Sequence, residues 1–282
     1  MQCAWQALLN LLPLWLRNDV DKLGRDTLQE IRLRLNQPPE LVMKKQRHFL
    51  NRLVDKDDLA FCINIASRYS PWAASTIAKG YITASGGHRV GICGNAVFAD
   101  QQMSGIRLAT SICIRVARDF YGIAKKARQY DGSVLIIGPP GTGKTTLLRD
   151  FIRQRSDFQN EFVSVVDERE EIFPFEDKQP CFYAGKHTDI ISGCSKKTGI
   201  DVVLRNMTPE TVAVDEITAQ EDCESLIHAG WCGVKLLATA HAGTRKDLES
   251  RPIYKPICTS GIFDTLIILR RDKTWSGERM NI

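Results

Sequence analysis

A glycine-rich segment at residues 138–145 has the pattern of a loop that binds nucleotide phosphates. It reads GPPGTGKT, which matches GxxxxGK[ST], and it lies between an apolar run and a helical pattern. Glycines let backbone N–H groups converge on phosphate oxygens, and the N-terminus of the next helix adds about half a positive charge. We expect Lys144 to reach the β- and γ-phosphates and Thr145 to ligate Mg²⁺. The residues expected to contact the nucleotide are Gly138, Pro139, Pro140, Gly141, Thr142, Gly143, Lys144, Thr145 and Thr146.

Two carboxylates follow the apolar run at 212–214, in the segment TVAVDEIT. The carboxyl ends of parallel strands face the nucleotide crevice, so both side chains should lie there. We expect Asp215 to hold Mg²⁺ through water and Glu216 to act as the general base for an attacking water. A strand that ends in DE is by itself a weak signal, but the upstream phosphate-binding loop makes it strong.

A second acidic segment, SVVDEREE at residues 164–171, competes for the role of base. Its carboxylates Asp167, Glu168 and Glu170 are candidates, and Arg169 could touch phosphate. The alternative is a charged surface loop, but loops at the ends of strands often carry function. The sequence leaves the choice between Glu168 and Glu216 open.

A third segment, LLATAHAG at residues 236–243, ends an apolar run with Thr239 and His241. A polar residue at this edge can contact the γ-phosphate, so His241 is a catalytic candidate, with a structural or solvated histidine as the alternative. The other four histidines show no ligand spacing, and the nine cysteines contain no CxxC pair. We therefore expect neither a zinc ribbon nor a redox pair.

The second half of the chain alternates short apolar runs with helical patterns. The helix expected at 146–155 turns Leu147, Leu148, Phe151 and Ile152 toward a sheet. Continuous apolar runs are typical of buried parallel strands, and they occur at 134–137, 162–166, 212–214, 236–239 and 266–269. We predict an α/β fold, with a RecA-like P-loop ATPase domain at 121–282.

The first half favours a smaller α+β domain at residues 1–120. Alternating strands are expected at 30–36 and 111–117, and a hairpin at 80–94 with Gly86 and Gly87 in its turn. A helix is expected over 58–79, with a break near Pro71, and a short strand at 41–43. The apolar segment 3–16 lacks the basic start of a signal peptide and predicts a packed N-terminal helix, with a membrane-surface helix as the alternative.

Composition and charge exclude some classes of protein and indicate which kinds of partner the chain could bind. With 43% hydrophobic and 25% charged residues the chain is neither disordered nor collagen-like, and no apolar run approaches the roughly 20 residues that span a bilayer. The cysteine pattern favours a reducing, cytosolic compartment. The net charge is +5, and the basic excess lies in the first 130 residues. That half should attract nucleic acid, anionic lipid or an acidic protein face, unless its charge is simply solvated.

The whole set of motifs resembles one family. GPPGTGKTTLLRD, SVVDEREEI, LRNMTPETVAVDEI and ATAHAG follow EIRLRLNQP, GYITASGGHRVGICG and SICIRVARD in the order seen in the stage III sporulation protein AA family. The resemblance covers nearly the whole chain. It places Glu168 and Glu170 in an acidic box, Asp215 and Glu216 in a magnesium motif, and His241 in a histidine box.

The resemblance implies a Mg²⁺-dependent ATPase related to the ATPases of type II and type IV secretion systems. Such a protein would hydrolyse ATP to energise or gate a sporulation-associated export channel, as a ring that is usually a hexamer. Its partners would be membrane-embedded channel proteins, and it would be cytoplasmic, on the mother-cell side of the forespore membrane. ATP rather than GTP follows from the resemblance, since no NKxD motif is present. An arginine acting on the neighbouring subunit could be Arg205, Arg89 or Arg115.

Two other functions fit the residues less well. A nucleic-acid-linked ATPase would use a basic sheet face, for which Arg32, Arg34, Arg89 and Arg115 are candidates. Single-strand binders also need aromatic stacking platforms, and only Tyr81 lies near these strands. A binding scaffold with an idle P-loop is disfavoured because Lys144, Thr145, Asp215 and Glu216 are present together.

Overall fold

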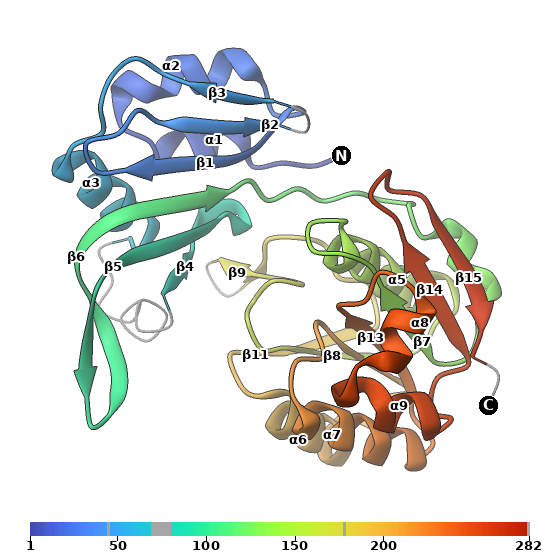
Figure 1. Cartoon of the computed structure of the whole chain (residues 1–282). Coiled ribbons are helices and arrows are strands. Elements are labelled where there is room, and N and C mark those ends of the chain that lie inside the picture. The colour runs from blue at the N-terminus through green and yellow to red at the C-terminus, as the bar shows by residue number, and fades with distance from the viewer. Residues whose placement is uncertain (44–45, 69–79, 177–178, 281–282) are drawn as a thin grey trace. The chain divides into compact units, whose positions relative to one another are not determined.

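Two large β-sheets, beside one two-stranded pair, organise the described part of the chain (Figure 1). The structure is a computed structural model that describes residues 1–43, 46–68, 80–176 and 179–280. The first compact unit comprises Met1–Asp119 with Glu176–Cys181, and the second comprises Phe120–Phe175 with Phe182–Ile282.

The second unit is built on a seven-stranded sheet with the order β11-β8-β12-β13-β7-β14-β15. Neighbours from β11 to β14 are parallel, and β15 is antiparallel to β14. Strands β7 and β12 are continuous apolar runs with every residue buried, as expected of strands covered on both faces. The bounds are β7 Val134–Ile137, β8 Val163–Asp167, β11 Thr188–Ser192, β12 Thr211–Val214, β13 Lys235–Ala240, β14 Thr265–Leu269 and β15 Trp275–Arg279. This sheet confirms the predicted α/β class.

Helices cover both faces of this sheet. Helix α5 (Lys144–Phe158) packs on β7, β8, β11 and β13. Helices α6 (Lys196–Asn206) and α7 (Gln220–Trp231) share an apolar cluster with Leu135 and Val166, and Figure 1 shows them on the side of the sheet away from α5. The shorter elements are η3 Lys125–Gln129, α8 Arg245–Ser250, η4 Pro252–Tyr254 and α9 Lys255–Thr259. Strands β9 (Phe175–Glu176) and β10 (Gln179–Pro180) form a separate pair.

The first unit holds a six-stranded sheet with the order β3-β2-β1-β6-β5-β4, in which all neighbours are antiparallel. Its core combines sheet residues such as Ile31 and Ile114 with Leu8, Leu16 and Leu59 from three helices. The expected hairpin turn at 86–87 is confirmed, with η2 (Ser85–Gly87) between β4 and β5. The bounds are α1 Trp5–Asn10, α2 Leu14–Leu23, β1 Leu28–Arg34, β2 Glu40–Met43, β3 Arg47–Phe49, α3 Lys56–Ala66, β4 Tyr81–Thr83, β5 Arg89–Ala99 and β6 Gln102–Arg115.

The helices of this unit differ from the sequence expectation at their ends. Pro13 divides the N-terminal segment into α1 and α2, because proline donates no backbone N–H and its ring collides with the preceding turn. Helix α3 begins earlier than predicted because the Asp55 side chain accepts from the Asp57 and Asp58 N–H groups in a capping box. The part of the expected helix at 69–79, with its break near Pro71, lies outside the described residues. No described helix has the length and apolar character to cross a bilayer.

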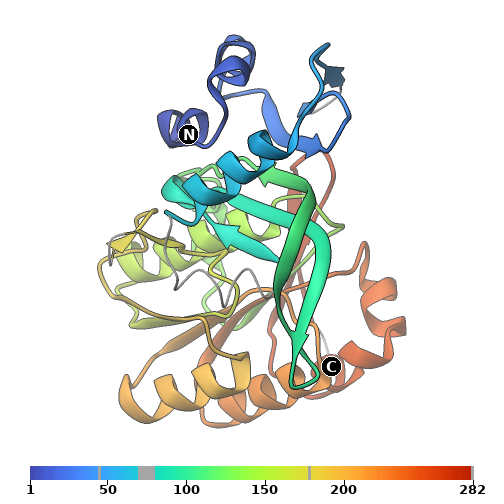
Figure 2. The same ribbon diagram turned by 90° about the vertical axis from the view of Figure 1, so that its left-hand side faces the viewer.

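The ribbon formed by β5 and β6 is much longer than the sequence predicted (Figure 2). Its outer half pairs residues 94–99 with 102–109 and leaves Val97, Phe98 and Leu108 exposed. No one-sided alternation marks this segment, because many of its side chains are exposed, although Ile106 and Ala109 pack against the core of the first unit. The prediction therefore ended the first strand too early and began the second too late.

Candidate nucleotide site

The phosphate-binding loop runs from the end of β7 to the start of α5. Gly141 and Gly143 have φ values of 72° and 101°, in the left-handed region that favours glycine. A Cβ on Gly138 would lie 2.7 Å from the Leu269 carbonyl oxygen, so the loop can follow β14 this closely only with glycine there. The three glycines thus shape the loop by backbone conformation and by close approach.

The side chain of Lys144 folds back over the loop. Its Nζ donates to the carbonyl oxygens of Gly138 and Pro139, at 2.9 Å and 3.3 Å, and lies 3.0 Å from Nδ1 of His241. Burial lowers the pKa of Lys144, while the charges of Asp215 and Glu216 act against that shift. Lys144 therefore joins the loop to the strand end that carries His241.

Asp215 connects the loop to two neighbouring strands. Its Oδ2 accepts from the Thr145 hydroxyl at 2.6 Å, and its Oδ1 accepts from the Thr239 hydroxyl at 2.5 Å. Among the described residues no group of three or more His, Cys, Asp or Glu side chains could hold a metal ion. Mg²⁺ at a nucleotide site takes few protein oxygens, with phosphates and waters completing its shell. The Thr145 and Asp215 oxygens fit that requirement.

Glu216 and His241 form the next link. Nε2 of His241 lies 2.6 Å from Oε1 of Glu216, and a guanidinium nitrogen of Arg169 lies 3.4 Å from Oε2. Because the Lys144 ammonium can only donate to Nδ1, the neutral ring carries its proton on Nε2 and donates it to Glu216. The backbone N–H of Glu216, with φ 48°, donates to the Thr239 hydroxyl. The structure thus links four predicted residues in one series of side-chain contacts, which runs through Lys144, His241, Glu216 and Arg169.

The acidic segment after β8 divides into residues with different surroundings. Asp167 is buried, and its carboxylate accepts from the N–H groups of Glu171, Ile172 and Phe173. Burial raises the pKa of Asp167 to about 7, and the N–H groups of Phe173 and Ile172 act in the opposite direction. Its contacts are those of a residue that shapes the loop.

Glu168 and Glu170, predicted together, lie in different places. Oε2 of Glu168 is 2.6 Å from Nζ of Lys196, on the wall of a small polar cavity that Asp215 and Glu216 also line. Glu170 does not line that cavity. Its φ is 55°, and its N–H donates to the Asp167 carbonyl oxygen in the turn. Of the two, Glu168 is the one placed beside the carboxylates of β12.

An apolar cavity of about 460 Å³ adjoins the loop. The sequence analysis missed it, because its wall joins residues far apart in the chain and no motif marks Trp275 or Lys273. Trp275 is held by a 3.3 Å hydrogen bond from its indole N–H to the Ile123 carbonyl oxygen and by the Phe151 ring 6.0 Å away. The lining consists of Phe120, Ile123, Leu147, Leu269 and Trp275 with Thr142, Gly143, Thr146 and Lys273.

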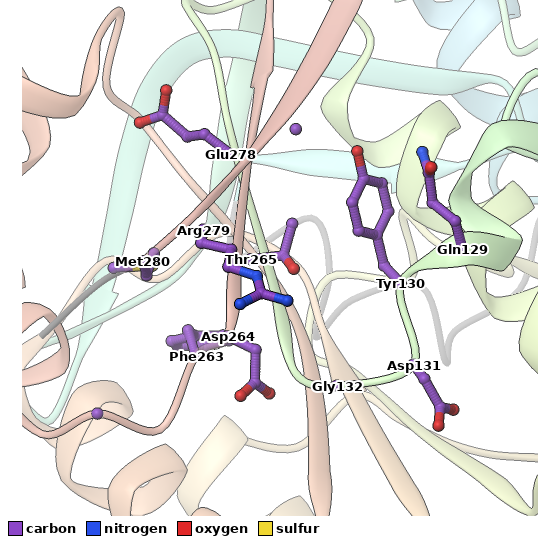
Figure 3. Close-up of a pocket in the computed structure, with 12 residues that line it drawn as sticks. Gln129, Tyr130, Asp131, Gly132, Phe263, Asp264, Thr265, Glu278, Arg279 and Met280 are labelled. Carbon is purple, nitrogen blue, oxygen red and sulfur yellow. The ribbon is translucent and has the colours of Figure 1, made fainter.

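Another cavity of the second unit, about 570 Å³, lies elsewhere (Figure 3). Thr265, the first residue of β14, lines this cavity. Leu269, the last residue of β14, lines the apolar cavity beside the phosphate-binding loop. Figure 3 shows Tyr130 and Asp131 facing Asp264 and Arg279 across it. It is therefore at the opposite edge of the sheet from the phosphate-binding loop.

The arginines predicted for the basic domain are partly neutralised. Arg32 pairs with Glu30 at 2.8 Å, and Arg34 pairs with the buried Glu40 at 2.8 Å. The Arg89 guanidinium lies 4.1 Å from the centre of the Tyr81 ring. His88 is buried, with its ring nitrogens bonded to backbone groups of Ala4 and Ala117. Arg115 lies on β6, and Arg205 is exposed on α6.

The strand order and the loop after β7 define a RecA-like P-loop domain, preceded by a smaller α+β domain. The ATPase DotB of Yersinia pseudotuberculosis has the same fold, with a TM-score of 0.61 at 17% identity over 94% of this chain and 77% of that chain. The pilus retraction motor PilT, solved with bound ADP, has a TM-score of 0.60 at 15% identity over 90% and 77% of the two chains.

The chain belongs to the family described as Sporulation stage III, protein AA, whose model matches residues 5–280. It is 36% identical to the Stage III sporulation protein AA of Bacillus subtilis (strain 168) over 256 residues, which are 87% of this chain and 83% of that protein. The family predicted from the motifs is confirmed.

Proposed function

We propose that this chain is a Mg²⁺-dependent ATPase that energises or gates a sporulation-associated export channel. The observation that carries the proposal is the 2.6 Å hydrogen bond between Thr145 and Asp215. It joins the loop that would hold the phosphates to the strand end that would hold the metal. A glycine-shaped loop without that carboxylate would support binding only.

The loop would bind the triphosphate through its backbone N–H groups and Lys144. The Lys144 ammonium already lies over the loop, and its bonds to Gly138 and Pro139 would be exchanged for phosphate oxygens. Thr145 and Asp215 would hold Mg²⁺, which neutralises charge on the β- and γ-phosphates. Residues 138–146 and these two metal-site oxygens would thus form the binding part of the site.

Glu216 is our choice as general base. It would take a proton from a water whose oxygen attacks the γ-phosphorus, while the bond from that phosphorus to the bridging oxygen breaks to give ADP and phosphate. His241 holds the Glu216 carboxylate by its Nε2–H, and the same ring contacts Lys144. Glu168 is instead paired with a buried lysine, and Glu170 does not line the polar cavity. These contacts favour Glu216 over the acidic-box carboxylates.

The nucleobase would occupy the apolar cavity beside the loop. Adenine stacks well on aromatic and aliphatic side chains, which Phe120, Leu269 and Trp275 provide. Among the described residues that line this cavity there is no carboxylate, the group that would accept from both N–H donors on the edge of guanine. This lining supports ATP over GTP.

Family membership and the similar solved structures support a proposal for assembly and location. DotB is called an ATPase and PilT a pilus retraction motor. We propose that this chain acts as a ring, a hexamer, on the cytoplasmic mother-cell face of the forespore membrane, with membrane-embedded channel proteins as partners. Arg205, Arg89 and Arg115 remain the candidates for an arginine that reaches the next subunit's γ-phosphate. The ion pairs of Arg32 and Arg34 weaken the alternative of a nucleic-acid-linked ATPase.

The direct test measures phosphate release with ATP for wild type, Lys144→Ala and Lys197→Ala. Lys197 is an exposed lysine on α6 and serves as the matched control. We expect Mg²⁺-dependent turnover that Lys144→Ala reduces at least about 100-fold and Lys197→Ala leaves unchanged. Equal rates in wild type and Lys144→Ala, or turnover that survives EDTA, would refute the proposal.

A further inference from the structure

The turn between β14 and β15 has a fixed conformation that presents one lysine. The N–H of Arg270 donates to the Thr274 carbonyl oxygen, and the N–H of Lys273 donates to the Arg270 carbonyl oxygen. Asp272 Oδ1 accepts from both the N–H and the hydroxyl of Thr274. These bonds hold Lys273 with φ 72°, a conformation that only a well-determined turn maintains for a residue with a side chain.

From this turn, the Lys273 side chain makes hydrogen bonds to the phosphate-binding loop. Its Nζ donates to the carbonyl oxygen of Gly141 at 2.8 Å and to that of Thr142 at 2.9 Å. Lys144 holds the carbonyl oxygens of Gly138 and Pro139 in the same way. Two lysines from opposite ends of the second unit's sequence therefore hold four of the loop's carbonyl groups.

A hydrogen bond to a backbone carbonyl also fixes the orientation of the N–H group in the same peptide plane. In a trans peptide the C=O and the N–H of the same plane point in opposite directions. The carbonyls of Gly141 and Thr142 share their planes with the N–H groups of Thr142 and Gly143, which therefore point away from Lys273. The Thr142 N–H donates to the Pro139 carbonyl oxygen at an N–O distance of 3.4 Å, on the side of the peptide away from Lys273. Phosphate oxygens would bind on that side and replace this long hydrogen bond.

The two prolines of the loop make these two amides a large share of its backbone N–H donors. Pro139 and Pro140 have no N–H, so two positions of the loop donate nothing. Between these prolines and the start of α5, the backbone donors are on Gly141, Thr142 and Gly143. Two of those three are oriented by the lysine of the hairpin.

We propose that Lys273 is a positioning residue for nucleotide binding, which acts by orienting the Thr142 and Gly143 amides toward the phosphates. The inference rests on the proposed function and names a residue outside every motif of the chain. Lys273 also lines the cavity assigned to the base, together with Thr146 and Trp275, so its positive charge adds to the phosphate side of that cavity. Its contribution is to affinity, and it takes no proton in the reaction.

The test compares Lys273→Met with Lys273→Arg and Arg271→Met in the full-length chain. Arg271 is an exposed cation in the same turn and is the matched control for lost charge. Dissociation constants for ADP, ATP and tripolyphosphate are measured by calorimetry, with kcat and KM from phosphate release. We expect Lys273→Met to raise all three dissociation constants and KM about tenfold and to change kcat less than about twofold. Lys273→Arg should restore most of the affinity, and Arg271→Met should match wild type.

The outcomes separate this inference from the function on which it rests. If Lys144→Ala abolishes binding while Lys273→Met binds like wild type, the role of Lys273 is refuted and the ATPase proposal stands. If neither variant alters binding, the ATPase proposal itself fails. A fall in kcat with unchanged KM would also refute a role in affinity. If Lys273→Met does not fold, as judged by its thermal transition, Lys273→Gln is measured in its place.

Discussion

The ammonium of Lys196 lies 2.6 Å from Oε2 of Glu168, and the lysine side chain is only 3% exposed. The same ammonium is 3.4 Å from Oδ2 of Asp222, near the start of α7. Asp222 in turn accepts from the backbone N–H groups of Thr218 and Ala219. Lys196 therefore ties the acidic segment after β8 to the loop that follows Glu216.

Replacing Lys196 with methionine should destabilise the second unit. The change leaves two carboxylates without their shared cation, and removing one partner of a buried ion pair is costly. Because the Glu168 side chain is 36% exposed, water screens part of the loss, and we expect about 2 kcal/mol of unfolding free energy. Urea denaturation of Lys196→Met beside Lys197→Met measures it. A loss equal to that of the exposed control would mean that the pair contributes nothing.

Glu216→Gln and Glu168→Gln should affect turnover unequally. Glutamine keeps the size of the side chain but cannot accept a proton, so the variant of the true base loses about 100-fold or more in kcat and still binds ATP. We expect this result for Glu216 and a loss of less than about tenfold for Glu168. Single-turnover hydrolysis with ATP binding measured in parallel separates chemistry from affinity. The reverse order of effects would assign the base to Glu168.

Trp275→Leu should weaken nucleotide binding through the base alone. A base stacked on an aromatic ring contributes about 1–3 kcal/mol, so the dissociation constant for ATP should rise about tenfold. Binding of tripolyphosphate, which has no base, should not change, in contrast to the result expected for Lys273→Met. Trp231→Leu on α7, where the side chain is 75% exposed, is the control. A variant with wild-type affinity for ATP would show that the base binds elsewhere.

Arg34→Met should make the first unit less sensitive to acid. The hydrogen bond from Arg34 lowers the pKa of Glu40, while burial of the carboxyl acts in the opposite direction. A lowered pKa means that the pair stabilises the fold above the unfolded value of about 4.3 and that this stability is lost as pH falls through the lower folded value.

The measurement is unfolding free energy at pH 7 and near pH 3. Arg34→Met should lose about 1 kcal/mol at pH 7 and less at pH 3, with Arg107→Met, an exposed arginine on β6, as control. An equal loss at both pH values would show that packing of the arginine stem, and not the charge pair, is responsible.

Much of the fold and the core of the site could be read from local patterns. Strands β7, β12 and β13 are recognisable because a strand covered on both faces is a continuous apolar run. The residue spacing of the phosphate-binding loop, followed by the carboxylates after β12, is a pattern that occurs in few other kinds of site. Since these strands are parallel, their carboxyl ends meet at one edge, and the convergence of Thr145 and Asp215 was predictable.

Strands at the edge of the sheet and contacts between distant residues could not be predicted from such local patterns. Strand β15 lies at the edge of the sheet with mostly exposed residues, so its sequence has no apolar run. Only the pairing of β14 with β7 brings the hairpin turn to the loop, and only then does Lys273 meet Gly141 and Thr142. The same holds for Lys196 and Glu168. Residue spacing along the chain predicted the chemistry of the loop. Packing between distant segments decided which side chains contact it, because such contacts depend on distance in space and produce no periodic pattern in the sequence.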